Sequence, residues 1–331
     1  MGVGEKHAIF YNNYKHTKLT KIYEKNLKKR KKLKKKYPLI NFVKNENDIY
    51  KDKDIKLISI ASYDNFHYKQ IVKAAKYKKN IFVEKPICLF LSELKKINLA
   101  IKKSNIKLGC NFVLRKNNQF IKIKNIYDKK ILGKPFFIEG DYNYGRLNKI
   151  TKGWRGKIPF YSVTHGGAIH MIDLILWFLK ELPYEVKAEG NKIVTHKSKF
   201  KFNDFSVGIL KFKSGLIAKI SSNFGSVTPH HHAFKIFGTK GSIYSDLRGA
   251  VLFKNRDQKI KPKLFKLETS FRQKTQVIKN FVDDLILKKN IVIKSNFREI
   301  MNSMLISLCI EKSIKTKKTI KIDYKNIKLY E

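Results

Sequence analysis

The sequence is poor in cysteine, and this excludes two classes of protein. Only three of its 331 residues are cysteine, and Cys88, Cys110 and Cys309 lie far apart, each among apolar neighbours. They show none of the paired spacing that disulfide frameworks and zinc sites use. We therefore predict three small core residues and neither a disulfide scaffold nor a cysteine metal site.

Long apolar runs are also missing. No window approaches the roughly 18 to 20 uncharged apolar residues that a membrane helix needs, and no apolar secretory segment follows a basic start. These absences predict a cytoplasmic protein with no membrane partner. The composition is 43% hydrophobic and 12% aromatic, which is enough to fill the core of a chain of this length.

Acidic residues and arginine are both scarce. The chain has 26 Asp and Glu against 72 Lys and Arg, a formal charge of +46, but only eight of the basic residues are arginine. Arginine makes the forked contacts that read phosphate and guanine. Because lysine is spread over almost every segment, we interpret the charge as a genome-wide codon bias and do not expect specific nucleic-acid binding. The dense run at residues 25–36 is predicted to be a solvated helix face, with polyanion binding as the alternative.

The first third of the chain alternates short apolar runs with longer amphipathic stretches. This pattern is typical of strands and crossover helices in a parallel sheet, and it predicts a Rossmann-like, doubly wound α/β domain over residues 1–114. Strands are predicted at residues 19–24, 40–43, 55–61, 80–84 and 106–112.

After about residue 115, long strands follow one another with few helices between them. We predict an α+β domain over residues 115–331, with a large open, mostly antiparallel sheet that helices cover on one face. A broad apolar sheet face is rarely left in water, so the other face is expected to form a homodimer or homotetramer. Strands are predicted at 134–144, 184–194, 205–212, 216–224 and within 233–245, and helices around 167–180, 271–288 and 298–315.

Three short segments carry chemistry. Gly2 and Gly4, with Glu24 about twenty residues later at the end of a strand, fit a dinucleotide fingerprint in which glycines approach pyrophosphate and the acid binds ribose. In KNIFVEKPICLF, residues 79–90, a carboxylate and an ammonium interrupt an apolar run, which costs several kcal/mol unless they lie at the strand's mouth or are paired. GGAIHMIDLILW, residues 166–177, is predicted to be a deeply buried helix that contains one histidine.

The order and spacing of these segments, together with SYDNFHY at residues 62–68, resemble the glucose-fructose oxidoreductase and inositol dehydrogenase family (Gfo/Idh/MocA) along essentially the whole chain. The resemblance implies an NAD(P)-dependent oxidoreductase that acts on a hydroxyl or keto carbon of a sugar, polyol or sugar derivative. Family members often begin with an apolar strand that ends in glycine, so the chain resembles a member that lacks the first strand of its Rossmann domain.

The resemblance also assigns roles to residues. Lys85 would bind the cofactor and orient the substrate hydroxyl, and His170 would take its proton; these two are the expected catalytic residues. Glu24 favours NAD because a carboxylate repels a ribose phosphate, and NADP is the alternative because lysines follow within residues 25–29. The expected cofactor-binding residues are Gly2, Gly4, Glu5, His7, Glu24, Ser62, Asn65, His67, Glu84, Lys85 and Asn111.

The substrate is expected to lie against polar and aromatic side chains of the second domain. His230 and His232 share one face of a strand, but neither a carboxylate nor a cysteine completes a ligand set, so no metal is expected. The expected substrate-binding residues are Lys85, Arg115, Trp154, Arg155, Tyr161, His165, His170, Asp173, His230 and His232.

One position departs from the family pattern. An aspartate usually stands four residues before the histidine of the buried helix, and here that position is Gly166. His165 or Tyr161 is the candidate substitute. The alternative is a redox-inactive family member that binds cofactor or sugar without turnover.

Overall fold

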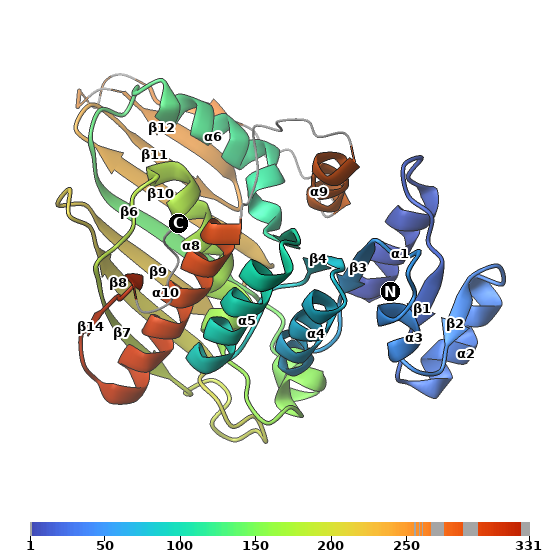
Figure 1. Ribbon diagram of the computed structural model, residues 1–331. Helices are drawn as coiled ribbons and strands as arrows, with labels where there is room; N and C mark the ends of the chain where they lie inside the picture. The colour runs from blue at the N-terminus through green and yellow to red at the C-terminus, as the bar shows by residue number, and fades with distance from the viewer. Residues whose placement is uncertain are drawn as a thin grey trace.

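The computed structural model describes residues 2–254, 256–257, 259, 261–265, 275–286 and 297–325. Two sheet-based parts lie side by side (Figure 1), a small parallel one near the N-terminus and one with a nine-stranded sheet that includes all the remaining described strands. In the described part of the chain, no helix is long and apolar enough to cross a membrane.

The N-terminal part alternates helices and parallel strands, as predicted. Its strands form two groups, a β1-β2 pair and a β3-β4-β5 sheet, and in the described residues no strand joins them. Figure 1 shows the two groups apart from each other, with α1 next to both. The elements are α1 (Val3–Asn13), β1 (Lys21–Tyr23), α2 (Leu27–Lys36), β2 (Asn41–Val43), α3 (Asn47–Tyr50), β3 (Leu57–Ile60), α4 (Asp64–Lys76), β4 (Asn80–Val83), α5 (Leu91–Ser104) and β5 (Leu108–Cys110).

The apolar pattern explains which helices are buried. In α5, the buried Leu94, Ile97 and Ile101 recur at helical spacing, and Asn105 ends the helix in the left-handed conformation that asparagine tolerates. The lysine-rich α2 buries no residue, and its N-cap Asn26 accepts a bond from the Lys29 amide. The predicted solvated helix is therefore confirmed.

The larger sheet has the strand order β13-β12-β11-β10-β6-β9-β8-β7-β14, and only its β6-β9 pair is parallel. Helices α8 and α10 cover one face (Figure 1), as predicted. The strands are β6 (Pro135–Asn143), β7 (Glu185–Asn191), β8 (Phe205–Lys211), β9 (Ile217–Asn223), β10 (His231–Gly238), β11 (Ser242–Asp246), β12 (Gly249–Phe253), β13 (Lys263–Phe265) and β14 (Ile320–Lys321). The α-helices are α6 (Asn118–Asp128), α7 (Asn148–Thr151), α8 (Ile169–Leu179), α9 (Gln276–Ile286) and α10 (Phe297–Thr316).

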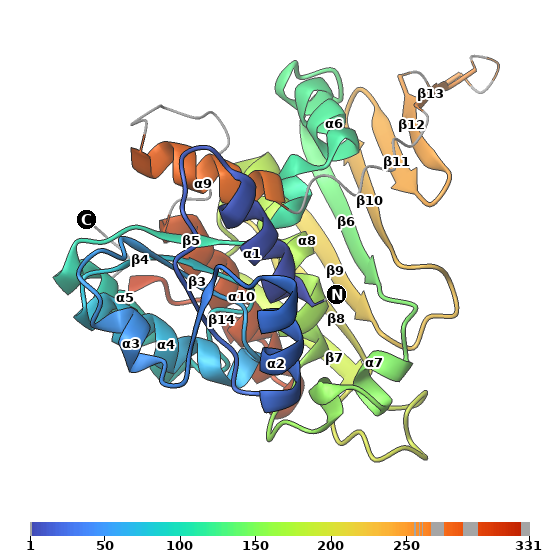
Figure 2. The ribbon, with the colours of Figure 1, turned by 90° about the vertical axis from the view of Figure 1, so that its right-hand side faces the viewer.

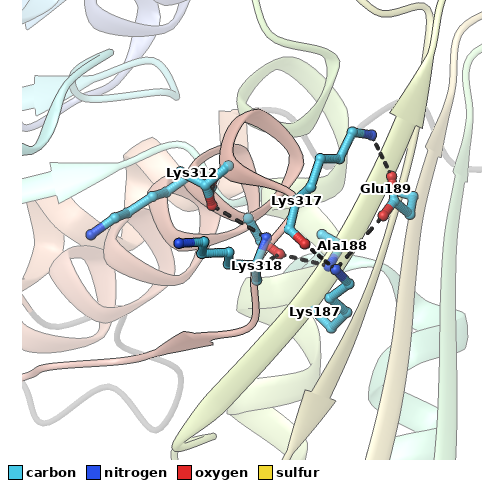
Figure 3. A network of polar contacts seen from close by, with 8 residues as sticks. Lys187, Ala188, Glu189, Lys312, Lys317 and Lys318 are labelled. Atoms are coloured by element: carbon cyan, nitrogen blue, oxygen red, sulfur yellow. Dashed lines mark hydrogen bonds and ion pairs between the residues drawn. The ribbon is translucent and has the colours of Figure 1, made fainter.

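The end of α10 is tied to β7 by polar contacts (Figure 3). Lys317 Nζ donates to Glu189 Oε2 at 2.6 Å, and the buried Ser313 hydroxyl accepts from the Ala188 amide at 2.9 Å and donates to the Lys318 carbonyl at 2.7 Å. Because the Ser313 hydroxyl both accepts and donates a hydrogen bond, it joins the helix end to the strand and is itself fully satisfied.

Helix α9 returns from the C-terminal half to the N-terminal part (Figure 2). Its Ile278 and Val282 form a separate apolar cluster with Tyr11 of α1 and Phe82 of β4. A Cβ at Gly109 of β5 would lie 2.6 Å from the Phe281 ring, so only glycine permits this approach. The predicted helix at 271–288 is thus present over 276–286, and residues 271–274, 287 and 288 lie outside the described residues.

The three cysteines are free and buried, which confirms the prediction of small core residues.

Candidate active site

Glu84, Lys85 and Pro86 follow the last residue of β4, and this placement explains the charged interruption of an apolar run. Val83 is fully buried, whereas Glu84 and Lys85 are half-buried. The pair therefore lies at the carboxyl end of the strand, where doubly wound sheets bind ligands. The Lys85–Pro86 peptide bond is cis.

Glu84 is held on one side of this segment by His7 and Asn111. Its Oε1 lies 3.1 Å from His7 Nε2 and accepts from Asn111 Nδ2 at 2.6 Å. Burial alone would raise the pKa of Glu84, but these bonds and the charges of His7 and Lys85 outweigh it, and the pKa lies below its ordinary value. Glu84 is accordingly an anion that orders α1 against the ends of β4 and β5.

Lys85 points the other way, toward the second part of the chain. Its Nζ donates to the Gly166 carbonyl at 2.6 Å. Burial lowers the pKa of Lys85; the charge of Asp64 opposes this, and that of Arg155 adds to it, so the pKa lies below its ordinary value. Such an ammonium shares a proton more readily than an exposed lysine does.

Gly166 lies one helical turn before His170. It belongs to a π-helical segment, Thr164–Ala168, that runs directly into α8. Residues four apart lie on the same face of a helix, so the carbonyl that Lys85 contacts is next to the histidine along that face. The segment therefore brings Lys85 and His170, 85 positions apart in sequence, to one place. His170 itself is 7% exposed.

The hydroxyl of Tyr161 occupies the space that a side chain at position 166 would take. A Cβ at Gly166 would lie 2.1 Å from the hydroxyl oxygen of Tyr161. That hydroxyl is buried beside the Arg155 guanidinium, and burial raises its pKa. Tyr161 can therefore donate a hydrogen bond here but is a weak acid. We refer to Asp64, Lys85, Arg155, Tyr161, Gly166 and His170 as the junction site.

Aromatic rings line the junction site on the side of the large sheet. The Tyr142 ring stacks on His170, with centroids 5.9 Å apart, and lies 5.1 Å from both His230 and His232. His232 is also 6.5 Å from His170. The two histidines thus share a face, as predicted, and that face is turned toward α8.

A second aromatic contact closes the junction between the two parts of the chain. Tyr63, just before α4, stacks on Trp154 with centroids 4.5 Å apart and an interplanar angle of 7°. This contact places the segment of Trp154 and Arg155 against the loop that follows β3.

Asp64 was not among the predicted residues. It is 8% exposed, and burial raises its pKa against the charges of His67 and Lys85. The neighbouring Asn65 is half-buried, and its Oδ1 has no partner among the described residues. An acid in the first turn after a strand at this edge was the signal that could have identified Asp64 from the sequence.

The residues expected near pyrophosphate and ribose lie around the start of α1. Gly2 caps this 11-residue helix, and a Cβ there would meet nothing within 4 Å, whereas Gly4 packs against Ala61. Glu24 follows β1 and accepts from the Asn26 amide at 2.9 Å. A helix N-terminus with open space before it fits a pyrophosphate. The buried Asn111 Oδ1, which has no partner among the described residues, offers a further acceptor.

Some predicted cofactor residues instead contact the protein. Glu5 binds Lys36 Nζ at 2.5 Å and so joins α1 to α2. The buried His67 ring lies between the carbonyls of Pro86 and Ser62, at 2.6 and 3.1 Å, and the Ser62 hydroxyl donates to Gln70. The polar atoms of Glu5 and His67 thus already contact the fold, and their role at the cofactor stays a prediction.

Some residues of the predicted substrate site also have polar partners within the fold. Arg115 binds Asp173 through two bonds of 2.8 and 2.7 Å, and its Nη1 contacts Glu299 at 2.5 Å. His165 is directed to Ser307 of α10, 2.7 Å from its hydroxyl, and burial lowers its pKa. Arg115 and Asp173 thus pair with each other beside the buried helix, and His165 contacts α10; their contact with a substrate stays a prediction.

Among the described residues, no three His, Cys, Asp or Glu side chains gather as a metal site would require.

Two family models match the chain. Residues 1–112 match the oxidoreductase family with an NAD-binding Rossmann fold, and residues 120–244 match the GFO/IDH/MocA C-terminal domain. The second model covers the strands and the helix that carry His170 and His232.

Curated relatives include a myo-inositol 2-dehydrogenase of Thermotoga maritima, which is 27% identical over 210 residues, 61% of this chain and 60% of the relative. An NAD+-dependent scyllo-inositol 2-dehydrogenase of Bacillus subtilis is 25% identical over 60% of this chain and 57% of its own length. The matched stretch thus spans about three fifths of these relatives.

Solved structures are similar from end to end. The myo-inositol 2-dehydrogenase of Lactobacillus plantarum superposes with a TM-score of 0.81 at 20% identity, over 97% of this chain and 96% of that one. A levoglucosan dehydrogenase in complex with NADH superposes with a TM-score of 0.82 at 17% identity, over 97% and 96%. At such identities the likeness shows the fold. The two family models and the fold agree, and the chain belongs to the Gfo/Idh/MocA family of oxidoreductases.

Proposed function

We propose that this protein is an NAD-dependent oxidoreductase that acts on a CH–OH carbon of a sugar, polyol or sugar derivative. The observation that carries the proposal is the 2.6 Å bond from Lys85 to the Gly166 carbonyl, because it brings the Glu-Lys-Pro segment to within one turn of His170. The inositol and levoglucosan dehydrogenases named above support this substrate class.

The N-terminal part, residues 1–114, would hold the cofactor. The start of α1 with Gly2 and Gly4 would receive the pyrophosphate, Glu24 the ribose, and Asn111 with Lys85 the nicotinamide side. Bound NAD supplies the hydride acceptor. Glu24 favours NAD over NADP, since its carboxylate would repel a ribose phosphate.

Residues 115–331 would hold the substrate. Lys85, with its lowered pKa, donates a hydrogen bond to the reacting hydroxyl, and His170 removes the proton of that hydroxyl. The hydroxyl of Tyr161, which occupies the space that a side chain at position 166 would take, is a further hydrogen-bond donor. Trp154, Arg155, His230 and His232 would contact the rest of the substrate.

The direct test measures NADH formation by the wild type with NAD and a panel of inositols, levoglucosan, sugars and alditols. We expect Lys85→Met and His170→Asn to lower kcat by roughly 10²- to 10⁴-fold, as the loss of an acid-base group does. His170→Asn should still bind NADH in a fluorescence titration. Turnover that survives both substitutions would contradict the proposed roles.

A second candidate is a family member that binds cofactor or sugar without turnover. Gly166 favours it, because no carboxylate stands four residues before His170 and the space is occupied by Tyr161. Tight NADH binding together with no turnover on the whole panel would favour this candidate. Binding of polyanions by α2 is a weaker possibility; an unchanged mobility of DNA and RNA at low salt would remove it.

We further propose a cytoplasmic homodimer or homotetramer that forms across the open face of the large sheet. That face exposes apolar side chains, among them Ile209, Ile217 and Tyr244 at 37%, 42% and 40%. Light scattering that shows a monomer at micromolar concentration would contradict the assembly.

A further inference from the structure

Arg155 is one of only eight arginines in a chain that uses lysine for nearly all its positive charge. Its guanidinium carbon lies 4.7 Å from the Trp154 ring and 5.9 Å from the rings of Tyr144 and Tyr161. Three aromatic rings thus fix a half-buried guanidinium in one place, which reduces the entropy that it would lose on binding a ligand.

The described acidic residues leave this guanidinium without an ion pair. Among the described residues, none forms an ion pair with Arg155, whereas the buried Arg115 has its fork filled by Asp173. A guanidinium presents five donors in a planar fork that matches carboxylate and phosphate oxygens. The fork of Arg155 therefore keeps the capacity to bind an anion.

A second arginine approaches the same ring. The guanidinium carbon of the exposed Arg146 lies 5.5 Å from the Tyr144 ring centroid. Like Arg155, it has no ion pair in the part of the chain that the structure describes. Two cations at one tyrosine repel each other unless an anion lies between or beside them.

The arginines are close to the groups that we assign to catalysis. The Tyr142 ring lies between His170 and Tyr144, 5.9 Å from each, so a row of rings joins His170 to the arginines. The Tyr63–Trp154 stack holds Arg155 against the loop that begins α4. The positive charge of Arg155 lowers the pKa of both Lys85 and Asp64. A small substrate bound at His170 would therefore extend toward Arg155.

We propose that the substrate is an acidic sugar derivative, whose carboxylate or phosphate group binds Arg155, with Arg146 as a second contact. This inference rests on the proposed function and narrows its substrate class. The anion offsets the charges of the two arginines and fixes which carbon of the substrate faces Lys85 and His170.

The test compares matched pairs of ligands on the NADH-bound protein by isothermal titration. The pairs are D-galacturonate with D-galactose, D-glucuronate with D-glucose, D-gluconate with D-glucitol, and D-glucose 6-phosphate with D-glucose. We expect at least one acid to bind 10-fold or more tightly than its neutral partner. The first three pairs report a carboxylate, and the fourth reports a phosphate.

The variants then locate the effect. Arg155→Gln should abolish the preference for the acid, and Arg155→Lys should restore only part of it, because lysine keeps the charge without the fork. Arg248→Gln, at a remote and exposed turn, should leave the preference unchanged. For an acid that is turned over, Arg155→Gln should raise KM at least 10-fold with a smaller effect on kcat.

Two outcomes would overturn the proposal: no acid preferred over its neutral partner, or a preference that persists in Arg155→Gln. Neither affects the proposed function, which would still be supported by NADH binding and by turnover of neutral polyols. Conversely, failure to bind NADH in the same titrations would refute the proposed function, while acid binding to the cofactor-free protein would still report on Arg155.

Discussion

The two most enclosed arginines of the described chain have opposite surroundings. Arg115 packs beside α8, and its fork is closed by Asp173 and Glu299, whereas Arg155 lies among aromatic rings with no ion pair in the described residues. Burial alone would lower the pKa of Arg115, but the two carboxylates outweigh it and raise the pKa. Polar groups that satisfy one another hold the fold together, and those with unused capacity are the ones that can bind a ligand.

The Arg115 cluster should dominate stability. Arg115→Met leaves the buried Asp173 carboxylate without its partner, and removal of one member of a buried pair costs about 3–5 kcal/mol. Urea unfolding followed by circular dichroism measures the loss. Arg248→Met, which breaks the exposed pair with Asp246, is the matched control and should leave the midpoint unchanged. A variant Arg115→Met as stable as the wild type would mean that the cluster has no structural role.

Gly166 tests the junction site by steric means. In Gly166→Ala the new methyl group would lie 2.1 Å from the Tyr161 hydroxyl, so the phenol must move, at a cost of about 1–3 kcal/mol. The double variant Gly166→Ala/Tyr161→Phe should recover part of the loss. Gly208→Ala is the control, because its methyl group would contact Ile310 at an ordinary 3.4 Å. Equal unfolding midpoints for the two alanine variants would refute the crowding.

Asp64 should show the smallest effect, and with the opposite sign. Its raised pKa means that the folded state holds the proton more strongly than the unfolded chain does, so ionisation costs stability as the pH rises above the ordinary value of 3.8. Asp64→Asn cannot ionise and should be more stable than the wild type at pH 7, with the gain lost toward pH 3. Loss of a favourable charge in the first turn of α4 opposes this by about 0.3–1 kcal/mol. A less stable Asp64→Asn at pH 7 would show that this carboxylate supports the fold.

Local chemistry made part of the candidate site predictable. Glu84 and Lys85 interrupt an apolar strand, and a charged pair is tolerated there only at the strand's end or when paired, so their position followed from desolvation cost alone. The solvated α2 followed in the same way from ten residues with two leucines. By contrast, α6, β12 and β13 were not predicted, although α6 has an N-cap at Asn117 and buries Phe120 and Ile123 at helical spacing, and β12 is a short apolar run.

Partners across the fold could not be predicted. Arg115, Asp173 and His165 are residue types that often form binding sites, but each contacts another polar group of the fold. The two acidic partners of Arg115 lie 58 and 184 positions away in the sequence. Asp64 and Asn65 are adjacent in sequence, and only the direction of the first turn of α4 decides which lies closer to Lys85.

The sequence by itself determined the alternation of strands and helices in the N-terminal part, the charged end of β4 and the burial of the helix that carries His170, because these depend on the polarity of neighbours a few residues apart. The tertiary structure decided which polar groups find partners, that a phenol fills the space beside Gly166, and that Arg155 keeps an open fork. Those outcomes depend on distances between residues far apart in the chain, and a hydrogen bond or ion pair is lost when such a distance changes by about an ångström.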